Sequence, residues 1–266
     1  MYDQFKRKIN YLRISVTDRC NLRCMYCMPA EGIKMVGHEE ILSFDEIVEV
    51  TKVAVSMGID KVRITGGEPL VRKGIVDLMK MIAGIDGIKD LAMTTNGILL
   101  HRFARPLADA GLHRVNISLD TLDPDTYYKI TRLGNIDDVF RGIKAAKQAG
   151  LKPIKINCVI KKSSDEPDAQ AVKKFALENN LKVRFIPEMN LETGSFSVVE
   201  GGDGGNCKIC NRLRLTATGK IKPCLFSDIE FDVRELGPEA AINLALGNKP
   251  QSGTVNHVDQ FHNIGG

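Results

Sequence analysis

The sequence has no run of 18 apolar residues, and no apolar stretch lies close to Met1. A membrane-spanning helix needs about 20 such residues and a secretory signal needs an apolar segment near the start, so we expect neither. An excess of one charge is also missing, because 37 basic residues face 33 acidic ones. A net charge of +4 is not that of a nucleic-acid-binding protein. We therefore expect a cytoplasmic protein without a membrane or nucleic-acid partner.

Cysteine, by contrast, is present seven times in 266 residues. The cytosol keeps thiols reduced, so these residues indicate metal or redox chemistry rather than disulfides. One of them, Cys158, lies in the apolar run Ile154–Ile160 and is predicted to be a small buried core residue. The other six fall into two sets of three, Cys20, Cys24 and Cys27, and Cys207, Cys210 and Cys224.

The first set occupies one short segment, Asp18–Cys27, with spacings of four and three residues. A structural zinc ion takes four ligands, and a ferredoxin-type [4Fe–4S] cluster takes four cysteines. Three thiols can hold three irons of such a cluster and leave the fourth iron open to a small molecule. The alternative is a zinc loop in which His38 is the fourth ligand.

The second set has a Cys-x2-Cys pair followed after 13 residues by Cys224. Alone, this spacing is equally typical of a zinc site or a redox pair. Beside a first set of three, a second cluster with its own open iron is the better interpretation. The segment Asn211–Arg214 follows at once and places two guanidinium groups next to that iron. Guanidinium groups suit phosphate oxygens.

Short apolar runs alternate with helical patterns between residues 11 and 187. The predicted strands are Leu12–Val16, Lys61–Thr65, Leu91–Thr95, Arg114–Leu119, Ile154–Ile160 and Lys182–Ile186. The predicted helices begin at Ser43, which forms a capping box with Glu46, and continue with Lys73–Ala83, Leu99–Ala110, Asp137–Ala149 and Pro167–Asn179. Six βα units are fewer than the eight that close a TIM barrel. The pattern therefore predicts an α/β fold with a partial, open (βα)6 barrel.

Polar side chains recur at every second position of these strands. In a βα sheet the helices cover the outer face, so the polar face must point into the barrel. Cations are costly to bury unpaired, and the interior is therefore expected to take an anionic ligand. The residues on this face are Arg13, Ser15, Lys61, Arg63, Thr65, Asn116, Ser118, Asp120, Lys155, Asn157, Lys182 and Arg184.

Three strand ends carry groups suited to ligands. Gly66–Pro69 follows the second strand at its carboxyl end, where barrel active sites lie. Its two glycines let the backbone approach a ligand closely, and Glu68 can meet an ammonium group. Thr94–Gly97 and Ser118–Asp120 add hydroxyl and amide groups suited to a sugar or an amino acid.

The first cysteine spacing, with Tyr26 before its last cysteine, resembles the signature of radical S-adenosylmethionine (SAM) enzymes. In that superfamily the open iron binds SAM, and one electron splits SAM into methionine and a 5'-deoxyadenosyl radical. Gly-Gly-Glu-Pro resembles the element that holds the methionyl amino group. A closer resemblance, to the GTP 3',8-cyclases of molybdenum-cofactor biosynthesis (MoaA), rests on Leu12–Cys20, Arg63–Leu70, Thr94–Gly97, Arg114–Leu122, Cys207–Gly219 and the terminal Gly265–Gly266.

The resemblance implies a radical SAM lyase that converts GTP to (8S)-3',8-cyclo-7,8-dihydroguanosine 5'-triphosphate, with two [4Fe–4S] clusters and SAM. The first cluster would be bound by Cys20, Cys24 and Cys27, and the second by Cys207, Cys210 and Cys224. The residues implied to contact SAM are Tyr26, Gly67, Ser118 and Met189. Those implied to bind GTP are Arg13, Arg63, Thr94, Lys155, Arg212, Leu213 and Arg214. No general acid or base is identifiable.

The resemblance also implies an external electron donor such as a flavodoxin or ferredoxin, and it allows a homodimer. We divide the chain into a barrel at 1–190, a glycine-rich connector at 191–206, and a second-cluster region with the C-terminal tail at 207–266. Members of the family have some tens of residues more between Met189 and Cys207, in a part that helps to wall the lower barrel. The alternatives are a radical SAM enzyme that acts on a peptide or another phosphorylated precursor, and a non-enzymatic zinc or iron–sulfur protein.

Overall fold

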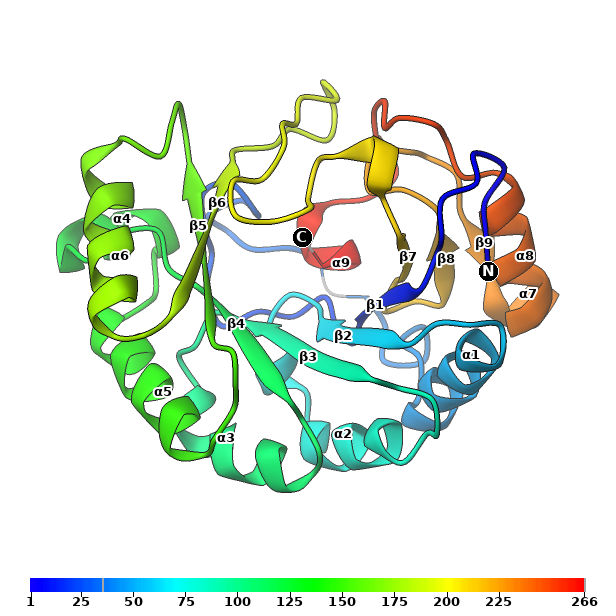
Figure 1. The fold of residues 1–266 in the computed structure, drawn as a ribbon, viewed down its shortest axis with the longest axis horizontal. Helices are drawn as coiled ribbons and strands as arrows, with labels where there is room; N and C mark the ends of the chain where they lie inside the picture. Colours follow the sequence, from blue (N-terminus) through cyan, green and yellow to red (C-terminus); the bar gives the residue numbers. More distant parts are fainter. Residues whose placement is uncertain (35, 266) are drawn as a thin grey trace.

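Short strands with apolar residues at alternate positions build the curved sheet at the centre of the molecule (Figure 1). The computed structural model describes residues 1–34 and 36–265. Within these residues, nine strands form one sheet in the order β6-β5-β4-β3-β2-β1-β7-β8-β9. The first six are parallel and confirm the predicted partial barrel: β1 (Tyr11–Ser15), β2 (Lys61–Thr65), β3 (Asp90–Thr95), β4 (Arg114–Ser118), β5 (Lys155–Ile160) and β6 (Lys182–Pro187).

Helices cover the outer face of these strands, so the inner face is left for polar side chains (Figure 1). They are α1 (Phe44–Ser56), α2 (Ile75–Ala83), α3 (Leu100–Asp109), α4 (Pro124–Thr131), α5 (Ile136–Gln148) and α6 (Pro167–Glu178). The capping box of Ser43 and Glu46 at the start of α1 is confirmed. Helix α4 was not predicted, although Asp123 caps it and Pro124 is its first residue.

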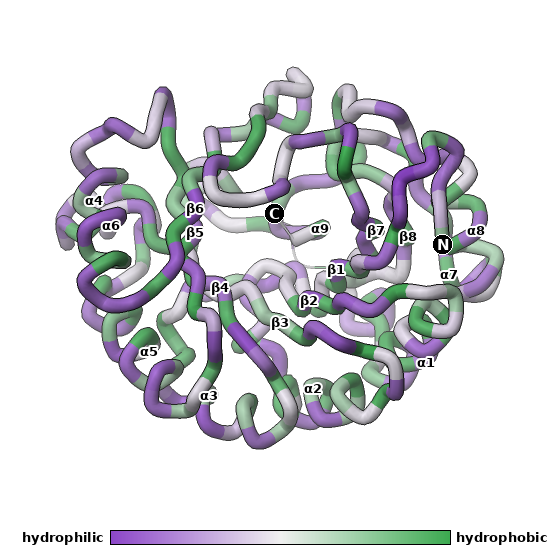
Figure 2. The backbone as a smooth tube through the Cα atoms, in the orientation of Figure 1, coloured by the Kyte–Doolittle hydropathy of each residue, from purple (hydrophilic) through white to green (hydrophobic). Residues whose placement is uncertain are grey.

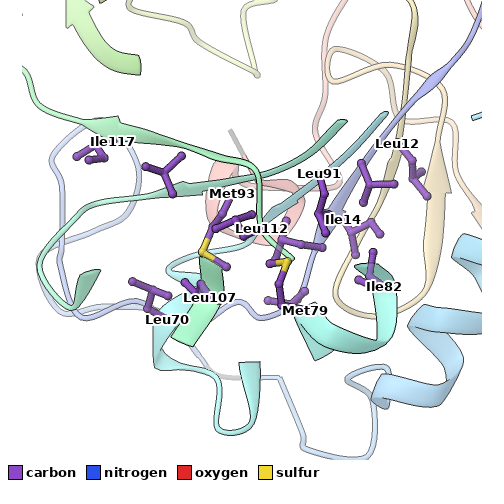
Figure 3. Close-up of a cluster of buried hydrophobic side chains, with 14 of the residues drawn as sticks. Leu12, Ile14, Leu70, Met79, Ile82, Leu91, Met93, Leu107, Leu112 and Ile117 are labelled. Atoms are coloured by element: carbon purple, nitrogen blue, oxygen red, sulfur yellow. The ribbon is translucent and has the colours of Figure 1, made fainter. Parts of the chain in front are cut away.

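The hydrophobic core lies between the sheet and the helices. Leu12 and Ile14 of β1 meet Met79 and Ile82 of α2 in this layer (Figure 3). Cys158 is fully buried in the same core, as expected. Figure 2 shows hydrophilic and hydrophobic residues interspersed along the strands, as expected of strands that separate a core from a polar interior.

The C-terminal part continues the sheet beyond β1. Strand β7 (Arg212–Leu215) pairs in parallel with β1, and β8 (Lys220–Lys222) and β9 (Phe231–Asp232) follow antiparallel. None of these three strands was predicted. The remaining elements are the short helices η1 (Pro69–Val71), η2 (Cys207–Ile209) and α7 (Val233–Leu236), then α8 (Pro238–Gly247) and α9 (Phe261–Ile264). Helix α9 lies in the opening of the barrel, close to the marked C-terminus (Figure 1).

The glycine-rich connector passes along the free edge of β6. Phe185 and Glu200 exchange both backbone hydrogen bonds, at 3.0 and 3.1 Å, in an antiparallel bridge. This single bridge ties the connector to the edge of β6 at the open side of the barrel. None of the helices in the described residues is long and apolar enough to span a membrane.

Candidate active site

Two cavities adjoin inside the barrel. The larger, of about 350 Å³, is lined by strand-face cations and by the second cysteine set. The smaller, of about 180 Å³, is lined by the first cysteine set and the carboxyl ends of the strands. Asn157, Ile186 and Met189 line both. The fold thus brings the two cysteine sets to two cavities that share part of their wall.

The first cysteine set follows β1 on a loop that turns at its end. The backbone N–H groups of Cys27 and Met28 both donate to the carbonyl of Cys24, at 2.9 and 3.1 Å. The Leu22 N–H donates to Cys20 Sγ at 3.4 Å, and Asn96 Nδ2 donates to the same sulfur at 3.8 Å. His38, the alternative zinc ligand, is exposed and does not line this cavity.

Burial dominates the titration of these three thiols. It raises the pKa of Cys20 to about 11 and that of Cys27 to about 12, and it raises the pKa of Cys24 as well. Bound iron favours thiolates, so buried thiols around a cavity fit a cluster that supplies the missing positive charge. Among residues 1–34 and 36–265, no group of three His, Cys, Asp or Glu side chains is gathered closely enough to hold a single metal ion.

Gly66–Pro69 supports the cysteine loop as well as lining the cavity. A Cβ atom on Gly67 would lie 2.4 Å from the carbonyl oxygen of Arg19. The Gly67 and Glu68 N–H groups donate to the carbonyls of Thr17 and Arg19, at 2.7 and 2.8 Å. The glycines thus admit the backbone that leads to Cys20.

Glu68 has a different role from the one expected. Its carboxylate accepts hydrogen bonds from Leu70 N–H at 3.0 Å, Thr95 Oγ1 at 2.8 Å and Asn96 N–H at 2.7 Å. Burial raises the pKa of Glu68 to about 7 despite these bonds. Glu68 does not line the cavity, so the expectation that it meets an ammonium group is replaced by a structural role.

The four residues implied to contact SAM all line a cavity wall. Tyr26, Gly67 and Ser118 line the smaller cavity, and Met189 lines both. The Tyr26 hydroxyl donates to Asp120 Oδ2 at 2.8 Å. Burial raises the pKa of Asp120 to about 6. Thr94, implied to bind GTP, lies on the wall of the smaller cavity rather than the larger one.

Cations form rows across neighbouring strands in the larger cavity. Arg13 on β1 is in register with Arg63 on β2 and with Arg214 on β7. Lys155 on β5 and Arg184 on β6 extend the lining, with Asp90 and Asp203 as the acidic members. Asp90 is already paired with Arg114 at 2.5 Å. The interior therefore carries a large excess of positive charge.

This charge is buried, and the pKa shifts follow from that. Burial and the guanidinium of Arg214 lower the pKa of Arg13, while burial lowers the pKa of Arg63. Burial, followed by Arg184, lowers the pKa of Lys155 to about 8. A bound anion would raise all three pKa values again, because it stabilises the charged forms of these groups.

Two of the lining residues were missed by the sequence analysis. Tyr11 lies under the guanidinium groups of Arg63 and Arg212, at 5.4 and 5.7 Å from its ring centre. Arg114 shares the strand face of Asn116. The same two-residue period that identified Arg13 could have found both.

The second cysteine set lines the larger cavity. Cys207 begins η2, Cys210 follows it, and Cys224 follows β8. Arg212 and Arg214 of β7 line this cavity. The side chain between them, Leu213, is packed in the hydrophobic core, so a contact of Leu213 with GTP would be made by its backbone.

The connector and the tail complete the enclosure. Val199, Gly202 and residues 203–206 line the larger cavity, so the short connector provides a wall there. Arg214 donates to the carbonyl of Gly265 at 2.7 Å, and a Cβ atom on Gly265 would lie 2.2 Å from Thr65 Cγ2. The tail therefore lies against residues of β2 and β7, the two strands that flank β1. Gly266 lies outside the described residues.

Sequence comparisons give consistent relatives. Residues 14–176 match the model of the Radical SAM superfamily. The chain is 43% identical over 282 positions to the GTP 3',8-cyclase of Thermodesulfovibrio yellowstonii, covering 89% of this chain and 88% of that protein. It is 43% identical over 279 positions to the GTP 3',8-cyclase of Moorella thermoacetica, covering 88% and 86%.

The gaps of this chain in the first of these alignments add up to some tens of positions. Its 282 positions involve 89% of 266 residues, which is about 237, so about 45 positions of the alignment have no residue in this chain.

Solved structures show the same fold at low sequence identity. The crystal structure of Streptococcus suis SuiB bound to S-adenosylmethionine matches with a TM-score of 0.65 at 18% identity, covering 86% of this chain and 64% of that one. This chain therefore spans less than two thirds of the SuiB chain. Native anSMEcpe with bound AdoMet matches with a TM-score of 0.64 at 15% identity, covering 91% and 81%.

Proposed function

This chain belongs to the radical SAM superfamily and, within it, to the GTP 3',8-cyclases, and we propose that it converts GTP to (8S)-3',8-cyclo-7,8-dihydroguanosine 5'-triphosphate. The reaction is the first step of molybdenum-cofactor biosynthesis and makes the protein a radical SAM lyase. It joins the ribose C3' to the guanine C8, so both ends of the nucleoside must be held at once. The single observation that carries the proposal is the cation-lined cavity between two cysteine sets.

The first cysteine set would hold the [4Fe–4S] cluster that binds SAM. When bound, the cluster and SAM supply a 5'-deoxyadenosyl radical, which removes hydrogen from ribose C3'. Tyr26, Gly67, Ser118 and Met189 surround the smaller cavity and would orient SAM there. The hydrogen bond from Tyr26 to Asp120 fixes the ring beside the cavity, while Glu68 holds the neighbouring loop.

The rows of cations would bind the triphosphate. Arg13, Arg63, Lys155, Arg212 and Arg214 all line the larger cavity and offer charge-assisted hydrogen bonds to phosphate oxygens. Guanidinium groups can contact two oxygens at once, which fixes orientation as well as affinity. Thr94 lies towards the SAM end and would contact the part of GTP nearest to it.

The second cysteine set would hold another [4Fe–4S] cluster, and an iron without a cysteine ligand would be available to the guanine. Cys207, Cys210 and Cys224 line the same cavity as the triphosphate-binding cations, on the side of β7. GTP extended between the two cysteine sets would place its ribose near SAM. An external donor such as a flavodoxin or ferredoxin would deliver the electron, in the cytoplasm.

The decisive experiment is anaerobic reconstitution followed by incubation with SAM, dithionite and GTP. Mass spectrometry should find the cyclised nucleotide together with 5'-deoxyadenosine. About eight irons per chain are expected, from four per cluster. Stoichiometric zinc with negligible iron would support the non-enzymatic alternative. SAM cleavage without any change to GTP would favour a different substrate.

A further inference from the structure

One loop reaches all three cysteines of the second set. It is the segment Lys249–Gly253, which follows α8. The Lys249 side chain lies beside the backbone that carries Cys210 and Cys224, because it donates to the carbonyls of Arg212 and Pro223. Ser252 Oγ donates to Cys207 Sγ at 3.6 Å. A Cβ atom on Gly253 would lie 3.4 Å from Cys224 Sγ.

The Lys249 side chain is almost fully buried, with 1% of its surface exposed. Its ammonium donates to the carbonyl of Arg212 at 2.8 Å and to the carbonyl of Pro223. These two bonds leave one of its three N–H groups for a further acceptor. The ion pairs in the described part of the chain include none with Lys249. A buried charge without a carboxylate partner is costly. We therefore expect the thiolates of the second cysteine set to be the counterions of Lys249.

The loop is also fixed from behind. The Arg7 guanidinium donates to the carbonyl of Pro250 at 2.7 Å and to that of Gln251 at 3.0 Å. It also donates to the carbonyl of Cys207 at 2.7 Å, and its Nε is paired with Asp3 at 2.6 Å. The position of Lys249 and Ser252 relative to the cysteines is therefore set by several backbone contacts.

The surroundings of the first cysteine set differ. The side-chain and backbone donors to Cys20 Sγ are neutral, from Leu22 and Asn96. The second set, by contrast, has the buried ammonium of Lys249 beside its backbone.

We propose that the segment Lys249–Gly253 tunes the second cluster, with Lys249 and Ser252 donating hydrogen bonds to its thiolates and holding its reduction potential above the value that the cysteines alone would give. The inference rests on the proposed second cluster. Reduction adds negative charge to a cluster, and hydrogen bonds to sulfur or a nearby cation stabilise that charge. Lys249 and Ser252 are positioning residues that act on substrate only through the cluster. The two clusters are thereby kept at different potentials.

The test uses a parent variant in which Cys20, Cys24 and Cys27 are replaced by alanine, so that only the second cluster gives a signal. After anaerobic reconstitution, its midpoint potential is measured by redox titration followed by electron paramagnetic resonance. Lys249→Met should lower the ratio of reduced to oxidised cluster at a fixed potential about tenfold, which is about 59 mV for one electron. Lys249→Arg should restore most of the shift, and Ser252→Ala should give a smaller shift in the same direction.

Lys208→Met is the matched control, since Lys208 is exposed and lies between Cys207 and Cys210 in sequence. Water screens its charge, so the potential should not move. If Lys249→Met does not bind the cluster, the test relies on Ser252→Ala. A midpoint potential in Ser252→Ala equal to that of the parent would then overturn the proposal. If Lys249→Met binds four irons and its midpoint potential equals that of the parent, the tuning proposal is overturned while the second cluster stands. If the parent variant binds no cluster, the proposal that the second cysteine set holds a cluster is refuted.

Discussion

Removing the Arg63 guanidinium should weaken GTP binding without weakening the fold. Arg63 is 6% exposed, and its cationic neighbours Arg13 and Arg214 lie in the same row of the sheet. In the absence of an anion, this burial among like charges is unfavourable, and burial already lowers the pKa of Arg63. Arg63→Met should therefore leave the free energy of unfolding of the GTP-free protein unchanged or higher.

Bound GTP reverses the sign of the effect. Loss of one charge-assisted hydrogen bond costs about 1.5–3 kcal/mol of binding free energy. This corresponds to a Kd raised roughly 10- to 150-fold. At a GTP concentration of about 100 times the parent Kd, the ligand stabilises the parent by about 2.7 kcal/mol. The same concentration should stabilise Arg63→Met by only about 0.3–1.4 kcal/mol. Arg63→Lys should recover part of the difference, because it keeps the charge and loses the planar fork.

Anaerobic titration calorimetry and thermal unfolding with and without GTP measure both halves of this prediction. Lys182→Met is the control, since Lys182 is exposed and does not line the cavity, although it pairs with Lys155 in the sheet. Equal affinity of the parent for GTP and guanosine would refute the reasoning. A marked loss of stability in GTP-free Arg63→Met would also contradict the reasoning, because Arg63 would then stabilise the folded protein rather than bind GTP.

Three further outcomes are expected. The pKa of Lys155 is lowered to about 8, so the affinity of the parent for GTP should fall as the pH rises through about 8, when Lys155 loses its proton, and calorimetry should find a flatter pH dependence in Lys155→Met. Replacement of Cys207, Cys210 and Cys224 by alanine should leave about half of the eight irons and retain SAM cleavage, but no cyclised GTP should form; full activity would exclude a second cluster. Deletion of Gly265 and Gly266 should preserve folding, iron content and SAM cleavage and abolish cyclisation, because the tail enters the barrel beside Arg214, and positioning of the substrate is worth several kcal/mol of the barrier.

The barrel could be predicted because its strands and helices have clear periods. The alternation of Arg13 with Leu12 and Ile14 fixes both the strand and its inward face. The same rule applied to Arg212, Leu213 and Arg214 would have predicted β7 and placed Leu213 in the core. A four-residue strand rich in arginine is, however, a weak signal without its partner β1.

The site could be predicted only where its residues are close together in the sequence. The first cysteine set lies in ten residues, and its loop is recognisable from spacing alone. The role of Glu68 depends on Thr95 and Asn96, which come from the next strand end. Lys249 reaches the carbonyl of Arg212, two residues after Cys210, from a loop after α8, and no local pattern connects them. Contacts between segments that are far apart in the sequence produce no repeating pattern from which they could be predicted.

The pairing of β7 with β1 has a consequence for the order in which the protein is made. Asn211 Nδ2 donates to Asn10 Oδ1 beside this pairing, across a sequence separation of 201 residues. At a synthesis rate of about 5–20 residues per second, that separation corresponds to roughly 10–40 s. During this interval the nascent chain holds β1 with one unpaired edge, and such edges invite pairing with other chains. Pairing with β7 covers this edge of β1 and, in the same step, adds Arg212 and Arg214 to the cavity. Both events therefore occur late in translation.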